Sequence, residues 1–295
     1  MPPATQTRRS EESQAFQQFS TPIALGFAAA TAAVMTPADL VLEPSAGTGL
    51  LAIFAELAGA RLALNEIADA RAGLLEQLFP AASVTRFDAA HIHDHLDAAI
   101  RPAVVLMNPP FSAAVHVDGH VADAAFRHIS SALARLAEGG RLVAITGANL
   151  APDTPAWRDG FIRLQECGRV LFSAAIDGSV YARHGTNVQT RLTVIDRIPA
   201  DDPAVFPPSP GIASDAATLL DWVIARVPPR AEATVTALAQ ILPRAAALPS
   251  RVTASRPVVS RPAAQPLTEA VELPYEACDW TPGDTGRLTL SLIHI

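Results

Sequence analysis

Between Leu40 and Asp196, short apolar runs alternate with longer segments that have the periodicity of amphipathic helices. This alternation is typical of βαβ units, which gather parallel strands into one sheet with helices on its faces. The expected strands are Leu40–Glu43, Arg61–Asn65, Val84–Phe87, Val104–Met107, Leu142–Thr146, Val170–Ser173 and Arg191–Ile195. The expected helices include Leu50–Leu57, Ala68–Leu78 and Asp123–Ala137.

The predicted fold is therefore α/β and Rossmann-like, with a doubly wound and mostly parallel sheet of seven strands. A polar, glycine-containing stretch joins the last two expected strands, and no helical pattern lies between them. Two strands that are connected without a crossover helix usually pair antiparallel. We accordingly expect one antiparallel strand at an edge of the sheet.

A change of composition near residue 200 divides the chain. Residues 201–295 hold 13 of the 25 prolines, many of them in extended segments typical of linkers. We expect a lead-in over residues 1–20, a compact domain over 21–199, and a proline-rich tail over 200–295. Two short helices are predicted in the tail, Ser214–Val227 and Glu232–Ala247. The tail ends without a closing pattern, so we expect a fragment truncated at its C-terminus.

Composition excludes several classes of protein. A hydrophobic fraction of 49% with only 17% charged residues is enough for a sizeable core. No apolar run approaches the roughly 18 residues of a membrane span, and the start has no signal core, which predicts a cytoplasmic protein. Cys167 and Cys278 do not have metal-ligand spacing. The net charge of −7 argues against tight, autonomous binding to nucleic acid.

The first candidate site is the turn after the first strand, VLEPSAGTG at residues 41–49. Gly47 and Gly49 would allow a ligand to approach the backbone, and the following helix would present free N–H groups. A turn that serves packing alone is the alternative. Glu66 ends the second strand, where it can accept hydrogen bonds from both ribose hydroxyls of an adenosyl cofactor. The alternative for Glu66 is a solvated acid at a helix start.

Two further motifs end the third and fourth strands. Asp88 can accept a hydrogen bond from the amino group of a cofactor adenine, or it can simply cap a helix. The run Asn108-Pro109-Pro110-Phe111 follows a buried strand, and its two prolines fix an extended turn. The Asn108 side-chain oxygen and the Pro109 carbonyl can then converge on one amino group, while Phe111 stacks on a base. A structural proline turn is the alternative.

Five segments in this order resemble the motifs of the N6-adenine DNA methyltransferases with the γ arrangement: FSTP (19–22), EPSAGTG (43–49), NE (65–66), FD (87–88) and NPPF (108–111). The resemblance implies S-adenosylmethionine as cofactor and adenine N6 in DNA as the favoured acceptor. It assigns the methionine end of the cofactor to Phe19, Thr21 and Pro22, and the loop around it to Glu43, Pro44, Ala46, Gly47 and Gly49. It assigns the ribose to Glu66, the cofactor adenine to Asp88, and the target base to Asn108, Pro109, Pro110 and Phe111, with Asn108 also bordering the cofactor.

The chain also resembles the methylase portion of bacterial plasmid- or phage-borne methylase–helicase proteins related to strawberry notch. The segments behind this resemblance are QQFSTPIALGFAAATAA, LEPSAGTGLLA and YARHGTNVQTRLTVID. It implies a helicase domain in cis beyond the tail, in a bacterial cytoplasm. The tail does not resemble a target-recognition domain, which a stand-alone DNA methylase normally carries. Because NPPF is shared more widely, an RNA or protein-glutamine methyltransferase and a non-catalytic module of a helicase stay as alternatives.

Three further groups of residues were considered for a functional role. His91, His93 and His95 have a spacing that spreads them around a helix, so we expect a solvated face and no metal site. Tyr181 precedes the last strand, where an aromatic ring can clamp a flipped base from its other side; a structural hairpin residue is the alternative. Trp157 and Phe161 share one helical face and are predicted to lie in the core.

Overall fold

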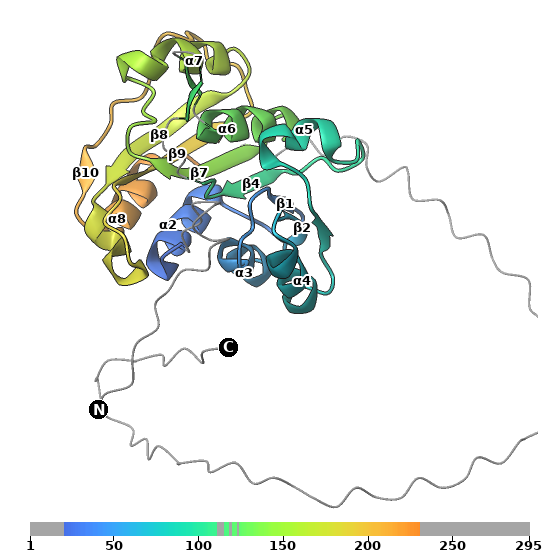
Figure 1. Ribbon diagram of the computed structural model, residues 1–295. Coiled ribbons are helices and arrows are strands. Elements are labelled where there is room, and N and C mark those ends of the chain that lie inside the picture. The colour runs from blue at the N-terminus through green and yellow to red at the C-terminus, as the bar shows by residue number, and fades with distance from the viewer. Residues whose placement is uncertain (1–20, 111–114, 118–119, 123, 231–295) are drawn as a thin grey trace, which may run out of the picture. The chain divides into compact units, whose positions relative to one another are not determined.

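An eight-stranded sheet forms the centre of the computed structural model, which describes residues 21–110, 115–117, 120–122 and 124–230 (Figure 1). Its order is β10-β8-β9-β7-β4-β1-β2-β3, and only β9 runs antiparallel to its neighbours. The strands are β1 (Leu40–Glu43), β2 (Arg61–Asn65), β3 (Ser83–Thr85), β4 (Val104–Met107), β7 (Arg141–Gly147), β8 (Arg169–Ile176), β9 (Thr190–Asp196) and β10 (Ile212–Ala213). The predicted mostly parallel α/β sheet is confirmed.

Two details of the sheet differ from the prediction. The eighth strand, β10, contains two residues and pairs with β8 at the edge. The antiparallel strand β9 does not lie at an edge, because it is inserted between β7 and β8 and pairs with both. The missing crossover helix does produce an antiparallel return.

A second, two-stranded sheet follows β4. Its strands β5 (Val115–Val117) and β6 (His120–Ala122) pair antiparallel and lie between the proline turn and the next helix. This hairpin was not predicted, because its strands are only three residues long.

Helices cover both faces of the main sheet (Figure 1). On one face pack α2 (Ile23–Ala33), α3 (Leu50–Leu57) and α8 (Ala216–Arg226), and on the other α5 (Ile92–His95), α6 (Ala124–Arg135) and α7 (Pro155–Gln165). The helix α4 (Asp69–Leu78) packs beside β2 and β3. The longest described helix has 12 residues, and none in this part of the chain could cross a membrane.

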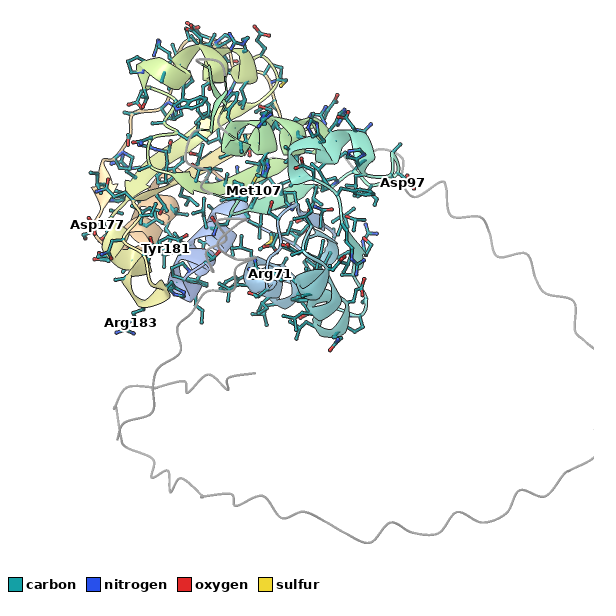
Figure 2. The ribbon with its side chains drawn as sticks, in the orientation of Figure 1. Arg71, Asp97, Met107, Asp177, Tyr181 and Arg183 are labelled. Atoms are coloured by element: carbon teal, nitrogen blue, oxygen red, sulfur yellow. The ribbon has the colours of Figure 1, made fainter. Side chains whose placement is uncertain are left out.

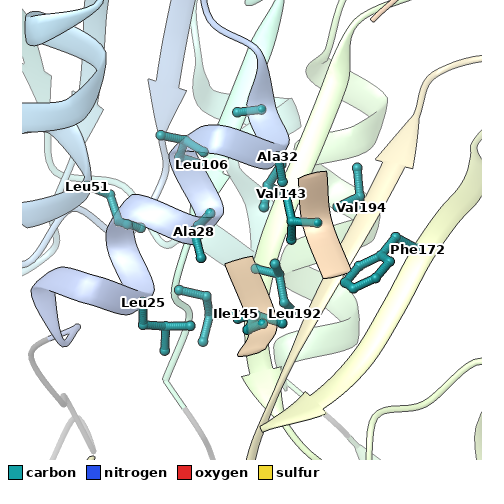
Figure 3. Packing of buried hydrophobic residues seen from close by; sticks show 14 of the residues in the cluster. Leu25, Ala28, Ala32, Leu51, Leu106, Val143, Ile145, Phe172, Leu192 and Val194 are labelled. Atoms are coloured by element: carbon teal, nitrogen blue, oxygen red, sulfur yellow. The ribbon is translucent and has the colours of Figure 1, made fainter. Parts of the chain in front are cut away.

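The alanine-rich helix α2 lies close against the centre of the sheet. Ala28 and Ala32 are fully buried, and they face Leu106 of β4 and Val143 of β7 (Figure 3). Short side chains let a helix approach a sheet closely without leaving voids. The N-terminus of α2 follows Thr21 and Pro22, so this packing fixes those two residues relative to β4.

The compact domain extends past the boundary expected at residue 200. Leu219 and Val223 of α8 belong to the same buried cluster as α2 and the central strands. Before α8, the side chain of Gln165 donates hydrogen bonds to the carbonyls of Pro203 and Val205 at 2.8 and 2.9 Å. The domain boundary was predicted too early because proline-rich segments were interpreted as a linker. Such extended segments can also run along the surface of a folded domain.

The segment after α8 is bound to the domain through two buried arginine side chains, Arg141 of β7 and Arg230 of the segment itself. Arg141 pairs with Asp196 at 2.7 Å and donates to the Pro228 carbonyl at 3.0 Å. Arg230 pairs with Asp39 at 2.6 Å, at the start of β1. The first predicted tail helix is therefore part of the domain as α8, and the second, at 232–247, lies outside the described residues.

Candidate active site

The turn between β1 and α3 needs both of its glycines, for different reasons. Gly47 and Gly49 have φ of +57° and +82°, a conformation that other residues rarely adopt. A Cβ on Gly49 would lie 2.5 Å from the Phe79 ring, so Gly49 also serves packing. A Cβ on Gly47 would have no atom within 4 Å. The open side of this turn is thus at Gly47, where backbone is accessible.

Glu66, at the carboxyl end of β2, holds the glycine turn in place. Its Oε2 accepts a hydrogen bond from the Gly47 N–H at 2.8 Å, and its Oε1 accepts one from the Ala68 N–H at 2.9 Å. The side chain is buried, with 3% exposed. A carboxylate has about four acceptor sites, so it can bind several donors at once.

Asn65 joins three strand ends, a role that sequence reasoning missed. Its Nδ2 donates to the carbonyls of Pro44 and Phe87, both at 2.9 Å. Its Oδ1 accepts from the Thr85 hydroxyl and the Phe87 N–H, both at 2.8 Å. All four hydrogen-bonding positions of the amide are used. The loops after β1, β2 and β3 are consequently held in one fixed arrangement.

A cavity of about 250 Å³ lies at the carboxyl ends of β1 to β4. Its lining comes from the loops after these strands and from α6: Pro44, Ser45, Asn65, Glu66, Ile67, Phe87, Asp88, Ala89, Pro110 and His128. Four predicted site residues, Pro44, Glu66, Asp88 and Pro110, thus meet at one cavity. A larger cavity of about 480 Å³ opens at the other edge of the sheet, near Leu40 and Arg61, and contains none of the predicted residues.

Asp88 fits both of its sequence interpretations. Its Oδ1 accepts from the Ala90 N–H at 2.9 Å and so caps the short helix that follows. The residue is exposed on the cavity lining, so its second oxygen can still accept a hydrogen bond. Pro110, predicted in the target-base motif, lines this cavity beside the adenosyl candidates.

Asn108 directly follows β4, and its amide is held from the side of α2. The Asn108 Nδ2 donates to the Thr21 hydroxyl at 2.9 Å, across 87 residues of sequence. The side chain of Asn108 also hydrogen-bonds Tyr181. Two partners of this kind restrict the rotation of the amide.

Tyr181 is not placed as a base clamp. Its ring is fully buried in the cluster that contains α2 and the central strands, so no ring face is available to a ligand (Figure 2). Burial raises the pKa of Tyr181 above its ordinary range, and the hydrogen bond with Asn108 opposes this shift. The residue touches the Asn108 amide instead, which makes it a positioning residue. The expectation of a stacking aromatic failed because the ring packs inward from the segment Gly178–His184.

Glu43 ends β1 beneath the glycine turn. It is buried, and burial raises the pKa of its carboxyl well above the ordinary value, while a backbone hydrogen bond from Ala52 lowers it and the charge of Glu66 raises it further. Its Oε2 has no hydrogen-bond partner among the described residues. Next to it in the turn, Ala46 is buried and donates its N–H to the Asn65 carbonyl at 2.9 Å.

The other candidates are quickly placed. Phe19 and Phe111 lie outside the described residues, and Pro22 immediately precedes α2. Phe161 is fully buried and Trp157 partly buried, as predicted for core residues. The HIHDH histidines are exposed, and no group of residues suited to a metal ion occurs in the described ranges. Ser45, which lies within the predicted turn 41–49, also lines the cavity. Ile67 and His128 line it but were not predicted, because nothing local in the sequence marks them.

Comparison with known proteins shows the fold of the chain. No family model and no curated protein matches the chain. Among solved structures, a chain described as the modification subunit of a type I restriction enzyme from Vibrio vulnificus is similar, with 15% identity, a TM-score of 0.56 and 72% of this chain covered. A Streptococcus thermophilus type I restriction-modification methyltransferase subunit has 13% identity and a TM-score of 0.51 over 63% of this chain.

A third similar structure comes from Listeria monocytogenes and is described as a class I S-adenosylmethionine-dependent methyltransferase. Its identity is 15% and its TM-score 0.53, with 71% of this chain and 69% of that chain covered. The alignments span only 54% of the Vibrio chain and 47% of the Streptococcus chain. The fold of this protein is thus that of the class I S-adenosylmethionine-dependent methyltransferases.

Proposed function

We propose that the protein is an S-adenosylmethionine-dependent methyltransferase that acts on an amino nitrogen, with adenine N6 in DNA as the favoured acceptor. The observation that carries this proposal is the fixed amide of Asn108, which lies directly after β4 and hydrogen-bonds Thr21 at 2.9 Å. Pro110, two residues further on, borders the 250 Å³ cavity. The cavity has an acid at each of two strand ends, and the polar amide precedes the cavity-lining Pro110 by two residues. This arrangement suits a cofactor and an acceptor that bind side by side.

The residues at the cavity fit the adenosyl part of this cofactor. Glu66 would hold the ribose hydroxyls, and Asp88 would accept from the adenine amino group. The open backbone at Gly47 would receive the methionine part, near Thr21 and Pro22. The buried Glu43 oxygen, which lacks a partner among the described residues, is a further polar atom under this turn.

The chemistry of the acceptor follows from Asn108 and Pro109. With its Nδ2 directed to Thr21, Asn108 can turn its Oδ1 toward an amino group that enters the site. The Pro109 carbonyl, fixed by the neighbouring Pro110, would accept the second hydrogen of that amino group. Two acceptors at one nitrogen favour a tetrahedral geometry, in which the lone pair is no longer delocalised into the ring. Phe111 would stack on the base.

Bound S-adenosylmethionine supplies a methyl group on a positively charged sulfur, which is a strong electrophile. Catalysis by the protein would accordingly rest on position and on exclusion of water rather than on a strong general base. Thr21 and Tyr181 would contribute by fixing the Asn108 amide before the acceptor arrives. The contacts of Asn108 with Thr21 and Tyr181 thus support a role in which the amide is positioned before the acceptor binds.

DNA as the acceptor is supported by the motif order and by structural similarity to subunits of type I restriction-modification systems. A helicase domain in cis, as in the methylase–helicase proteins that the sequence resembles, would supply the DNA binding that a net charge of −7 does not favour. RNA and protein glutamine are the other acceptors that the Asn-Pro-Pro-Phe motif allows.

The acceptor can be tested by methyl transfer from tritium-labelled S-adenosylmethionine to DNA, RNA and a protein extract in parallel. We expect label in DNA, and N6-methyladenine among its nucleosides after digestion. Label in RNA or protein alone would replace DNA as the acceptor but keep the amino-nitrogen chemistry. A protein that fails to bind S-adenosylmethionine would contradict the enzymatic proposal and favour a non-catalytic module.

A further inference from the structure

The helix α2 is apolar on every side, although one of its sides is exposed. Its sequence IALGFAAATAA has no charged residue, and its single polar side chain, Thr31, donates its hydroxyl to the Phe27 carbonyl at 2.9 Å. One side of α2 packs on the sheet through Leu25 and Ala32, which are fully buried. On the opposite side, Ile23 and Phe27 are 56% and 51% exposed. A helix that is apolar all round is normally buried, so a further segment is expected to cover this side.

The exposed side of α2 continues onto α3. The ring centroids of Phe27 and Phe54 are 6.2 Å apart, so the two helices touch there. On α3, Ile53 and Leu57 are 41% and 78% exposed. By contrast, no large apolar side chain of α5, α6 or α7, within the ranges that the structure describes, is exposed. We call Ile23, Phe27, Ile53 and Leu57 the α2–α3 apolar face.

The chain leaves the described domain beside this face. The Arg141 Nη1 donates to the carbonyls of Ala32 and Pro228, at 3.1 and 3.0 Å, which places the segment after α8 at the C-terminal end of α2. Arg230, the last described residue, is bound to Asp39 in the turn that follows α2. The helix α3 ends at the same edge of the sheet, because it connects the carboxyl end of β1 to the amino end of β2.

The sequence that follows has the pattern of a helix suited to this face. Residues 232–241, EATVTALAQI, contain one charged side chain, and six of the ten residues are strong helix formers. Val235, Leu238 and Ile241 are spaced by three and share one side of a helix; we call them the apolar stripe. Pro243 would end the helix shortly after them. Ten helical residues are about 15 Å long, which matches the length of about 16 Å for the 11 residues of α2.

We propose that residues 232–241 form a helix that packs its apolar stripe against the α2–α3 apolar face. The helix would begin beside Arg230 and run antiparallel to α2, toward Thr21. It would add a fourth helix to the layer in which α2 lies between α8 and α3 (Figure 1). Its outer side would carry Thr236 and Gln240, so exposed apolar surface would be replaced by polar side chains. This inference concerns the folded state and does not depend on the proposed function.

Hydrogen exchange of the full 295-residue chain, followed by mass spectrometry, tests this packing. In the wild type, the amides of residues 236–241 should exchange at least about tenfold more slowly than in a free peptide of the same sequence. Leu238→Glu places a charge in the apolar stripe and should return these amides to the rate of the free peptide. Thr236→Glu is the matched control, because it adds the same charge on the outer side and should leave the protection intact.

The reciprocal substitution tests whether the partner is the α2–α3 apolar face. Phe27→Glu should release the amides of residues 236–241, although the two sites are far apart in the sequence. Leu78→Glu in α4 is its control, because Leu78 is also 51% exposed but lies outside this face, and should leave the protection intact. If circular dichroism shows that Phe27→Glu does not fold, Leu57→Glu replaces it.

Three results would overturn the proposal. The first is free-peptide exchange of residues 236–241 in the wild type. The second is protection that persists in both Phe27→Glu and Leu57→Glu, because the helix would then pack elsewhere. The third is a different occupant of the face: a wild-type dimer that Phe27→Glu converts to a monomer in sedimentation, or protection within residues 1–20 that Phe27→Glu abolishes, each with residues 236–241 unprotected.

Discussion

The ion pair between Arg230 and Asp39 predicts that the folded domain includes the segment after α8. Both side chains are nearly buried, with 8% and 6% exposed. The Arg230 Nη2 lies 2.7 and 2.6 Å from the two oxygens of Asp39, and its Nη1 donates to the Ala103 carbonyl at 3.2 Å. Thr36 donates two more hydrogen bonds to Asp39, from its N–H and its hydroxyl.

Substitution of Arg230 by Met keeps the apolar length of the side chain but removes the guanidinium. The Asp39 carboxylate then stays buried with only the Thr36 donors. Removal of one partner from a buried ion pair costs about 3–5 kcal/mol, and the remaining donors place this case near the lower limit. For a domain of this size, a loss of about 3 kcal/mol lowers the melting temperature by about 6–12 °C.

Urea unfolding of the full chain, followed by circular dichroism, measures this loss. The matched control is Arg226→Met in the last turn of α8, where the side chain is exposed and the cost should stay below about 1 kcal/mol. Substitution of both partners, Asp39→Asn with Arg230→Met, should recover part of the loss, because no uncompensated charge is left. If Arg230→Met costs no more than Arg226→Met, the segment after α8 is not part of the cooperative domain.

Two further predictions concern groups around the site. Burial raises the pKa of Glu43 in the folded state, so folding is favoured while the carboxyl is protonated, and this stability is lost as the pH rises through the raised pKa. Glu43→Gln should therefore gain stability over wild type as the pH rises above the ordinary carboxyl pKa toward the raised one, by up to about 1.4 kcal/mol per pH unit, in urea unfolding at several pH values; parallel curves would contradict this. Tyr181→Phe removes the hydroxyl that contacts Asn108, and should lower kcat roughly tenfold while the KM for S-adenosylmethionine stays within about twofold. An unchanged kcat would show that Thr21 alone fixes the Asn108 amide.

The sequence predicts the sheet well because each strand is a short apolar run bounded by turn residues. The bounds of β1, β2 and β4 agree with the prediction, since these strands are buried and flanked by glycine, proline or acidic residues. The two-residue β10 and the three-residue strands of the β5–β6 hairpin were missed. The equally short β3 was found, with shifted bounds, because it lies between a helical pattern and the Phe87-Asp88 motif. The boundary at residue 200 was wrong because packing of α8 depends on partners far away in the sequence.

The residues of the site divide in the same way. Gly47, Glu66 and Asp88 could be found because parallel strands end at one edge, so a polar residue at each strand end is brought to the same place. Asn65 and His128 could not, because the four hydrogen bonds of the first and the burial of the second are set by tertiary contacts. Sequence spacing also does not show in which direction an aromatic ring points, as the buried ring of Tyr181 illustrates.

The proposed chemistry depends on the side-chain amide of Asn108. The substitution Asn108→Ala tests this dependence most directly. The paired measurement is methyl transfer to DNA from labelled S-adenosylmethionine, together with the Kd for the same cofactor by titration calorimetry. We expect transfer to fall by at least about three orders of magnitude while the Kd changes less than about fivefold. Full transfer activity in Asn108→Ala would contradict it.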